Sequence, residues 1–224
     1  MSPKISVIIP AHNEEDYIKS TLYALKIQTF QDFETIVVAN GCNDGTEEIL
    51  RKKGVNYLSL SKANVSLARN EGAKVAAGDL LVFLDADTLL EKDALQKINS
   101  KMSNVVVGTT LAKPDNSRFK FKMALGFKNF YMKSRIYKGC SGVLACNSAV
   151  FDKVGGYDNL VVREHRKLIL KMLDHGKYGV VKTHATTSMR RFSKWGLVKG
   201  LYFWGKEFVK DKTVGLSDEY ESVR

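Results

Sequence analysis

Two aspartates separated by a single residue are the sharpest chemical signal in the sequence. Asp85 and Asp87 directly follow the strongly apolar run 80–84. In extended backbone, residues two apart point to the same side of the chain. Two such carboxylates favour Mg²⁺ or Mn²⁺, which bind one or two carboxylates together with water and substrate phosphate oxygens. The alternative is that one aspartate caps a helix from about Leu89 and the other is an exposed loop residue.

The elements that position these aspartates follow a regular order in the first half of the chain. Strands are expected at 5–9, 35–38, 57–60 and 80–84, and helices at 15–28, up to about 53, and 65–77. This alternation with short links predicts an α/β fold with a mostly parallel sheet and helices on both faces. Ligands bind such sheets at the carboxyl ends of the strands, where Asp85 and Asp87 stand.

The second half is less regular. Strands are expected at 105–110, 143–146 and 180–183, and helices at 148–154, 162–175 and 194–210. The sequence contains no internal repeat, and no linker rich in Pro, Ser or Gly divides it. We therefore expect a single domain over residues 1–224.

Composition excludes several classes of protein. The 224 residues are 44% hydrophobic and 26% charged with only 3 prolines, which excludes collagen-like, low-complexity and wholly disordered chains. No apolar run approaches the roughly 18 residues of a membrane-spanning helix. The three cysteines (Cys42, Cys140 and Cys146) lack zinc-ligand spacing. Reduced thiols and a cytoplasmic location are the expectation.

The positive charge is concentrated in the second half. Residues 1–111 hold 12 Lys and Arg against 14 Asp and Glu, whereas residues 112–224 hold 23 against 10. Within Arg118–Lys138 there are seven basic residues, six aromatic residues and no acidic one. Such a segment attracts phosphates of nucleic acids, lipid head groups or substrates. A solvated helix face with its aromatic residues in the core is an equally good interpretation.

Four further stretches follow one another in a characteristic order: two after the expected strands 5–9 and 35–38, one within the expected helix 65–77, and one in the second half. They are Pro10-Ala11-His12-Asn13-Glu14-Glu15, Ala39-Asn40-Gly41-Cys42-Asn43-Asp44-Gly45-Thr46, Ala68-Arg69-Asn70-Glu71-Gly72, and the segment from Gly142 to Asp158 with its Gly155-Gly156-Tyr157-Asp158 end. Together with Phe83-Leu84-Asp85-Ala86-Asp87, this series resembles the family 2 glycosyltransferases of the GT-A fold. The resemblance covers about residues 4–170.

The resemblance implies a Rossmann-like GT-A sheet and an inverting transfer of a sugar from a nucleotide-diphosphate donor. It makes residues 1–111 the nucleotide-sugar-binding half and residues 112–224 the basic, acceptor-binding half. The implied donor-binding residues are Pro10, Ala11, Asn13, Glu14, Asn40, Arg69, Asp85, Ala86 and Asp87. Asp87 would hold Mn²⁺ or Mg²⁺ on the diphosphate, with Asp85 nearby at the ribose. The cation offsets the charge that develops on the leaving group.

The chain departs from the family pattern at two places. Many members carry two acidic residues where Ala39 and Asn40 stand, so the donor base stays open between uracil and guanine. The usual Glu-Asp pair that supplies the general base is replaced by Glu164-His165. Either side chain can take a proton from an acceptor hydroxyl. The alternatives are that both are surface residues of a basic helix, or that a phosphate acceptor makes a base unnecessary.

Two C-terminal features extend the same expectation. His184 follows a short strand and is a candidate additional metal ligand, although a lone histidine is more often structural. Arg191-X-X-Lys194-Trp195 is similar to a motif of membrane-bound members, and Arg190 or Arg191 is then a candidate diphosphate ligand. The aromatic, lysine-rich residues that follow either pack on the core or lie at a membrane interface.

The sequence therefore predicts a metal-dependent family 2 glycosyltransferase, cytoplasmic or peripheral to the membrane, with a glycan or lipid-linked acceptor such as a polyprenyl phosphate. Two other hypotheses remain. The first is a protein that binds nucleic acid or an anionic surface through its basic half, and the second is an inactive nucleotide-sugar-binding homologue. No recognisable nucleic-acid-binding motif is present, so a specific nucleic-acid partner is not expected.

Overall fold

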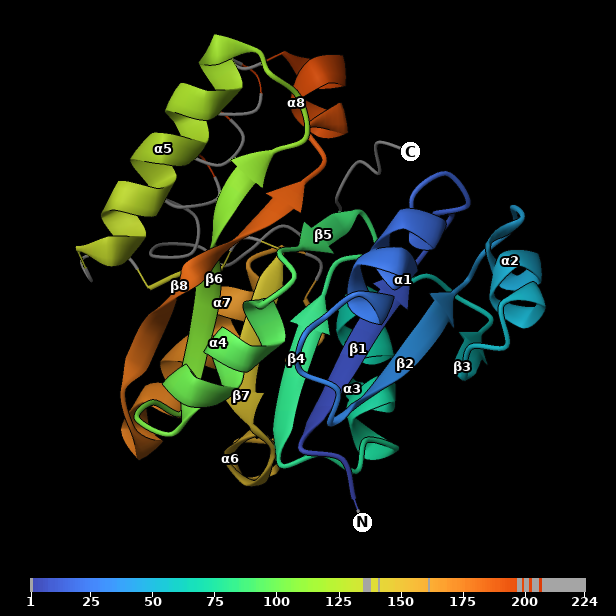
Figure 1. Cartoon of the computed structure of the whole chain (residues 1–224), viewed down its shortest axis with the longest axis horizontal. Helices are drawn as coiled ribbons and strands as arrows, with labels where there is room; N and C mark the ends of the chain where they lie inside the picture. The colour runs from blue at the N-terminus through green and yellow to red at the C-terminus, as the bar shows by residue number, and fades with distance from the viewer. Residues whose placement is uncertain are drawn as a thin grey trace.

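The computed structural model describes residues 2–134, 138–140, 142–160 and 162–196, together with residues 199, 202 and 206. An eight-stranded sheet runs through it in the order β3-β2-β1-β4-β7-β6-β8-β5 (Figure 1). The strands are β1 Ile5–Ala11, β2 Phe33–Asn40, β3 Tyr57–Leu60, β4 Leu80–Leu84, β5 Thr88–Leu90, β6 Val107–Pro114, β7 Val143–Asn147 and β8 Tyr178–Thr187. The helices are α1 Ile18–Lys26, α2 Thr46–Lys52, α3 Val65–Lys74, α4 Ala94–Met102, α5 Phe119–Lys133, α6 Ser148–Lys153, α7 Glu164–Met172 and α8 Arg190–Trp195.

The sheet is mostly parallel, which confirms the predicted fold class. Strands β3, β2, β1 and β4 are parallel neighbours, and β6 is parallel to β8. Strand β7 is antiparallel to both β4 and β6, and β5 is antiparallel to β8. The first four strands therefore form a uniform half, and all their carboxyl ends lie at one edge.

Apolar side chains on both faces of the sheet explain why the first strands are continuous hydrophobic runs. Val7 and Ile9 of β1 are fully buried in the cluster that includes α1 and α4 residues, whereas Ile8 packs on the other face with residues of α7. Helix α3 contacts β1 and β2. In Figure 1, α1 and α4 lie in front of the sheet and α3 and α7 lie behind it. The core thus covers both faces of the central strands.

The structure corrects the predicted helix from about Leu89. Thr88–Leu90 forms β5, which pairs with the distant β8 at Thr88↔Thr187, and α4 begins only at Ala94. A pairing across nearly 100 residues leaves no local signal in the sequence. Neither Asp85 nor Asp87 caps α4, because Asp93 stands at its N-terminal boundary. The capping alternative for the two aspartates is therefore wrong.

Other boundaries also differ from the prediction. Helix α1 begins at Ile18 rather than Glu15 because the chain first turns at Asn13, whose φ is 53°. Helix α8 covers Arg190–Trp195, whereas most of the helix expected at 194–210 lies outside the described residues, as do Arg135 and Tyr137 of the basic segment. In the described part of the chain, every helix is too short or too polar to cross a membrane.

Candidate active site

The loop that carries the two aspartates is held by hydrogen bonds from three separate segments. The backbone N–H of Asp85 donates to the carbonyl oxygen of Gly142 over 2.9 Å. The hydroxyl of Thr21, on the buried side of α1, donates to the carbonyl oxygen of Ala86 over 2.6 Å. The N–H of Ser188, after β8, donates to the carbonyl oxygen of Asp87 over 3.3 Å. The loop is therefore positioned by both halves of the chain.

Arg69 of α3 joins the aspartate loop to α7. Its Nη2 lies 2.9 Å from Asp85 Oδ1, and its Nη1 lies 2.8 Å from Glu164 Oε1. The guanidinium is only 3% exposed and lies 5.4 Å from the centre of the Tyr157 ring. Burial alone would lower the pKa of Arg69, but Glu164, Tyr157 and Asp85 together raise it above its ordinary value. Arg69 is therefore a permanent cation that fixes two carboxylates.

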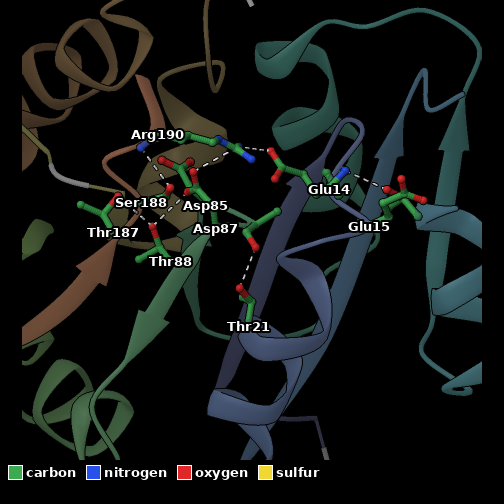
Figure 2. Close-up of polar contacts among 12 residues, drawn as sticks. Glu14, Glu15, Thr21, Asp85, Asp87, Thr88, Thr187, Ser188 and Arg190 are labelled. Carbon is green, nitrogen blue, oxygen red and sulfur yellow. Dashed lines mark hydrogen bonds and ion pairs between the residues drawn. The ribbon is translucent and has the colours of Figure 1, made fainter. Parts of the chain in front are cut away.

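Arg190 makes the second guanidinium–carboxylate cluster. Its Nη2 lies 2.6 Å from Glu14 Oε1 and 3.1 Å from Asp87 Oδ2 (Figure 2). The guanidinium also lies 4.5 Å from the centre of the Tyr17 ring. Burial opposes the charge of Arg190, but the hydrogen bond to Glu14 and the charge of Asp87 raise its pKa. Arg190 thus connects the start of α8 to the loops after β1 and β4.

The surroundings of Asp87 disfavour the charged form of its carboxylate. Its burial and the neighbouring charge of Asp85 raise its pKa to about 6, although Arg190 acts in the opposite direction. Two close carboxylates in a poorly solvated position repel one another, and an added cation would relieve that repulsion. Asp85 is more exposed than Asp87, at 39% against 17%. The pair therefore has one inner and one outer carboxylate.

The loops after β1 and β2 are tied together by side chain to backbone hydrogen bonds. Asn13 Oδ1 accepts the N–H of Asn43 over 2.9 Å, and Thr46 Oγ1 accepts the N–H of Glu14 over 2.8 Å. Asn40 is buried, and its Oδ1 accepts the N–H of Asn64 over 2.7 Å at the start of α3. These predicted donor-binding residues therefore shape the edge of the sheet through their contacts with backbone.

Two other predicted donor residues lie in β1 itself. Ala11 is fully buried in the core, and its carbonyl oxygen accepts the thiol of Cys42 over 3.2 Å. Pro10 is partly buried and pairs in register with Val38 of β2. Both residues stand at the strand end that leads into the Asn13 turn. Their assignment to the nucleoside pocket stays a prediction.

Glu164 and His165 lie at the start of α7, close to the aspartate loop. Arg163, which precedes them, has a φ of 58°, a left-handed conformation that non-glycine residues rarely adopt. The ring Nδ1 of His165 lies 2.8 Å from the hydroxyl of Tyr157. Burial, together with the charges of Arg69 and Lys128, holds the pKa of His165 well below its ordinary value. His165 is therefore neutral at physiological pH.

The structure does not bring His184 to the two aspartates. Its backbone N–H donates to Glu91 Oε2 over 3.2 Å, and its Nδ1 lies 3.6 Å from Glu91 Oε1. It stands three residues, or roughly 10 Å, along β8 from Thr187, the partner of Thr88. Among the residues that the structure describes, no three His, Cys, Asp or Glu side chains form a metal-binding group. His184 therefore remains only a predicted ligand.

The structure also separates Arg190 from Arg191. Arg190 contacts the carboxylates, whereas the Arg191 guanidinium lies 5.9 Å from the centre of the Trp195 ring. Arg191 is still near enough for its charge to lower the pKa of Asp87. No sequence pattern distinguishes the two adjacent arginines, because only the direction of the chain into α8 decides which one faces the site.

Three residues with a part in the site were not singled out from the sequence. They are Thr21, which supports the aspartate loop, Tyr17 beneath Arg190, and Tyr157 beside Arg69 and His165. Thr21 carried a usable signal: it lies three residues after Ile18, on the apolar stripe of α1, where an unpaired hydroxyl is costly. Tyr157 belonged to the quoted Gly-Gly-Tyr-Asp stretch but had no role assigned to it.

A parallel half-sheet with acidic loops at its carboxyl edge, followed by an antiparallel strand, is the architecture of GT-A glycosyltransferases. The chain matches the model of glycosyl transferase family 2 over residues 6–154. It belongs to that family.

Relatives with assigned names are also glycosyltransferases. The chain is 25% identical over 183 residues to glycosyltransferase GlyA of Streptococcus pneumoniae, a match that covers 78% of this chain and 24% of GlyA. It is 32% identical over 148 residues to AglE of Haloferax volcanii, which covers 61% of this chain and 49% of AglE. The matches thus span between about a quarter and a half of the length of these relatives.

Solved structures confirm the fold. S. aureus TarS 1–349 in complex with UDP-GlcNAc superimposes with a TM-score of 0.68 at 20% identity, covering 84% of this chain and 59% of TarS. The mannosyltransferase PcManGT of Pyrobaculum calidifontis, in complex with GDP-Man and Mn²⁺, superimposes with a TM-score of 0.73 at 18% identity. That match covers 97% of this chain and 66% of PcManGT.

Proposed function

We propose that the protein is an inverting glycosyltransferase that moves a sugar from a nucleotide-diphosphate donor to the phosphate of a lipid-linked acceptor, with Mn²⁺ or Mg²⁺ at the diphosphate. One observation carries the proposal. At the carboxyl edge of a GT-A sheet, Arg69 and Arg190 hold four carboxylates from three different segments of the chain: Glu14, Asp85, Asp87 and Glu164. This arrangement supplies oxygen ligands for a cation and, in Arg190, a guanidinium group for phosphate oxygens in one place.

The donor class is supported by the two structural neighbours with nucleotide sugars. TarS is seen with UDP-GlcNAc and PcManGT with GDP-Man. In this chain the loop after β1 carries Asn13 and Glu14, and Asn40 is the last residue of β2, at the corresponding edge of the sheet. Asn40 replaces a common acidic residue, so both UDP and GDP remain candidates for the nucleotide.

The aspartate pair fits a divalent cation. Asp87 is only 17% exposed, and its burial and the charge of Asp85 raise its pKa even with Arg190 beside it, so a further positive charge would stabilise the ionised pair. Carboxylate oxygens are the ligands that Mg²⁺ and Mn²⁺ prefer, with water and diphosphate oxygens completing the shell. When bound, the cation would offset the negative charge that develops on the departing nucleotide diphosphate. Asp87 would be the principal ligand, with Asp85 beside it.

The chain's own cations would assist the departure of the nucleotide. The acceptor oxygen attacks the anomeric carbon on the face opposite the diphosphate, the bond to the diphosphate oxygen breaks, and the configuration inverts. Arg190 already lies beside Asp87, and its N–H groups can donate to diphosphate oxygens. Arg69 fixes the orientation of Asp85 and Glu164 rather than contacting the donor, because both of its Nη atoms are used within the protein.

The neighbourhood of Glu164 and His165 favours an acceptor that needs no general base. Glu164 is ion-paired to the buried Arg69, and the Nδ1 of the neutral His165 is hydrogen-bonded to Tyr157. A phosphate oxygen is already ionised and nucleophilic at neutral pH, whereas a sugar hydroxyl must lose a proton. A phosphate acceptor therefore suits the residues that replace the usual base.

A half-buried lysine on α5 supports the same acceptor. Burial lowers the pKa of Lys128, while the Cys140 thiol and the Asp85 carboxylate oppose that shift. The charge of Lys128 also lowers the pKa of His165, so Lys128 is within electrostatic range of both the aspartate loop and α7. Within the described residues, no hydrogen bond or ion pair satisfies its ammonium group. A lysine in this position offers a cation to an incoming phosphate.

Calorimetric titration of UDP and GDP tests the donor site. Each nucleotide is titrated into the protein with Mn²⁺, with Mg²⁺ and with a chelator. We expect one nucleotide to bind with metal only, and Asp87→Asn to weaken that binding at least about tenfold, because an uncharged amide is a poor ligand for a hard cation. Asp79→Asn is the matched control, since Asp79 lies at the opposite edge of the sheet in an exposed ion pair with Lys4.

Absence of binding of either nucleotide under all conditions would contradict the donor assignment. Equal binding by wild type and Asp87→Asn would contradict the metal site. Turnover is tested separately with short polyprenyl phosphates as acceptors, using release of the nucleotide as the readout. Nucleotide release that depends on the phosphate group of the acceptor supports the proposal, whereas release with a polyprenol but not its phosphate overturns the acceptor class.

A further inference from the structure

Helix α5 has two apolar faces, and only one of them packs on the protein. The inner face carries Phe121, Leu125 and Met132, which are buried. Phe121 and Leu125 pack with Ala112 of β6 and with Met189 and Phe192 at α8. Asn129 fixes the helix further, because its side chain amide bonds both the N–H and the carbonyl oxygen of Ala112. The position of α5 on β6 is therefore secured without its outer face.

The outer face of α5 carries a continuous apolar stripe that is exposed to solvent. Phe119, Met123, Phe127 and Phe130 are between 60% and 74% exposed. Their spacing of four, four and three residues places them along one side of the helix over roughly 17 Å. Among the described residues, five of the ten exposed large hydrophobic side chains lie on α5. Such a concentration marks an interaction surface.

The charges around this stripe are all positive. Arg118, Lys120, Lys122 and Lys133 are exposed, and the sequence contains neither Asp nor Glu between Asp115 and Asp152. On the helix, Lys122 and Lys133 lie to one side of the stripe and Lys120 to the other. An apolar stripe between rows of basic side chains is the pattern of a helix that lies in a membrane interface.

We propose that this outer face of α5 docks on a bilayer surface that contains anionic lipids. The lysines would contact the head groups while the phenylalanine rings and Met123 enter the boundary of the acyl chains. A second copy of the chain is a poor partner, since two such faces would bring basic residues together. A nucleic acid is also a poor partner, because its phosphates would need basic side chains at the centre of the surface. The centre is occupied by phenylalanines, and the lysines lie at its two sides.

The same helix connects this surface to the site. Lys128 lies on the side of α5 opposite the stripe, within electrostatic range of Asp85. Figure 1 shows α5 beside α8 at the end of β6 and β8. A bilayer beneath the outer face would therefore lie across α5 from Lys128, one helix diameter of about 10 Å away. The role of the docking in catalysis rests on the proposed lipid-linked acceptor. The docking itself is measurable without donor or acceptor.

Vesicle flotation of the full chain tests the docking. Vesicles of phosphatidylcholine alone are compared with an equal mixture of phosphatidylcholine and phosphatidylglycerol, at low and at high salt. We expect binding to the mixed vesicles at low salt and little binding to phosphatidylcholine alone. The double change Phe119→Ser/Phe127→Ser should weaken binding at least about tenfold, because each ring loses its transfer from water. Lys120→Gln/Lys122→Gln should weaken binding and reduce its salt dependence.

Matched changes on α1 are the controls. Tyr23 is 63% exposed, and Lys19 and Lys26 are exposed on the same helix. Tyr23→Ser and Lys19→Gln/Lys26→Gln should bind vesicles as the wild type does. All changed side chains are exposed, and nucleotide calorimetry on the same preparations reports whether the fold and donor site are intact. Loss of vesicle binding with intact nucleotide binding is the expected result for the α5 variants.

Three outcomes would overturn the docking proposal. The first is failure of the wild type to float with anionic vesicles at low salt while it still binds nucleotide. The second is flotation that is unchanged in Phe119→Ser/Phe127→Ser. The third is that the wild type binds a single-stranded oligonucleotide more tightly than it binds anionic vesicles, and that Phe119→Ser/Phe127→Ser abolishes this oligonucleotide binding. If nucleotide binding fails while vesicle binding persists, the donor assignment is at fault and the docking surface stands.

Discussion

The guanidinium of Arg69 and the carboxylate of Glu164 lie 2.8 Å apart, although the two residues are 95 positions apart in the sequence. The pair connects α3, in the uniformly parallel half, to the first residue of α7. The same guanidinium holds Asp85 at the end of β4. One buried side chain thus couples the aspartate loop to the position that usually supplies the general base in this family.

Breaking this pair should cost much of the stability of the protein. Arg69→Met removes the cation and leaves the carboxylate of Glu164, 13% exposed, without its partner. We expect the free energy of unfolding to fall by about 3 kcal/mol, as is typical when one member of a buried ion pair is lost. Urea denaturation measures it. Arg51→Met, at an exposed arginine of α2, should change the stability by no more than about 0.5 kcal/mol.

The support of the aspartate loop by α1 leads to a second prediction. Thr21→Val keeps the shape of the side chain but removes the hydroxyl that bonds the carbonyl oxygen of Ala86. The unpaired, buried carbonyl should cost about 1 to 3 kcal/mol of stability and weaken metal-dependent nucleotide binding, because the loop loses one of its supports. Thr29→Val is the control, since the Thr29 hydroxyl makes its 3.3 Å bond to Lys92 in an exposed position. Equal nucleotide affinity in Thr21→Val and Thr29→Val would show that the loop does not need this bond.

The uniformly parallel half of the fold was predictable because its signals are local. The runs at 5–9 and 80–84 are apolar on both faces, and each is followed by turn residues, so strand positions and the edge that carries Asp85 and Asp87 follow from the sequence. Strand β5 was not predictable in the same way. Its three residues form a strand only because β8 lies beside them.

The site was predictable as a set of residues but not as a set of contacts. The sequence placed Arg69, Asp85 and Glu164 among the functional candidates, and the structure brings them together. That Arg69 pairs with Glu164 depends on how α7 packs behind the sheet, which no local pattern reports. The choice of Arg190 over Arg191 likewise depends on the angle at which β8 enters α8.

The two adjacent arginines lead to a third prediction. Arg190→Gln removes the cation that contacts Glu14 and Asp87, so the carboxylates gain net negative charge. Mn²⁺ alone should therefore bind a few times more tightly, whereas the affinity for the nucleotide diphosphate with Mn²⁺ should fall about tenfold, because a charge-assisted donor to phosphate is lost. Arg191→Gln should have a smaller effect on both affinities. Calorimetry measures them, and a larger loss in Arg191→Gln would assign the diphosphate contact to Arg191 instead.

The buried His165 predicts a specific loss of stability in acid. Its pKa is well below the ordinary value in the folded protein, mainly because of burial, and about 6.5 when unfolded. The unfolded chain therefore binds a proton that the folded protein excludes, so stability is fully present above about pH 6.5 and is lost as the pH falls toward the folded-state pKa. Between about pH 7.5 and pH 5.5 this histidine should account for a loss of about 1.4 kcal/mol.

The change His165→Gln isolates that contribution. Glutamine does not titrate, and its side chain oxygen can still accept the hydroxyl of Tyr157. The variant should be less stable than the wild type at about pH 7.5, but the difference should shrink by about 1.4 kcal/mol at about pH 5.5. His175→Gln, at an exposed ring, should keep the wild-type dependence on pH. Urea denaturation at both pH values measures this, and a parallel pH dependence in wild type and His165→Gln would show that the folded protein accepts a proton at His165.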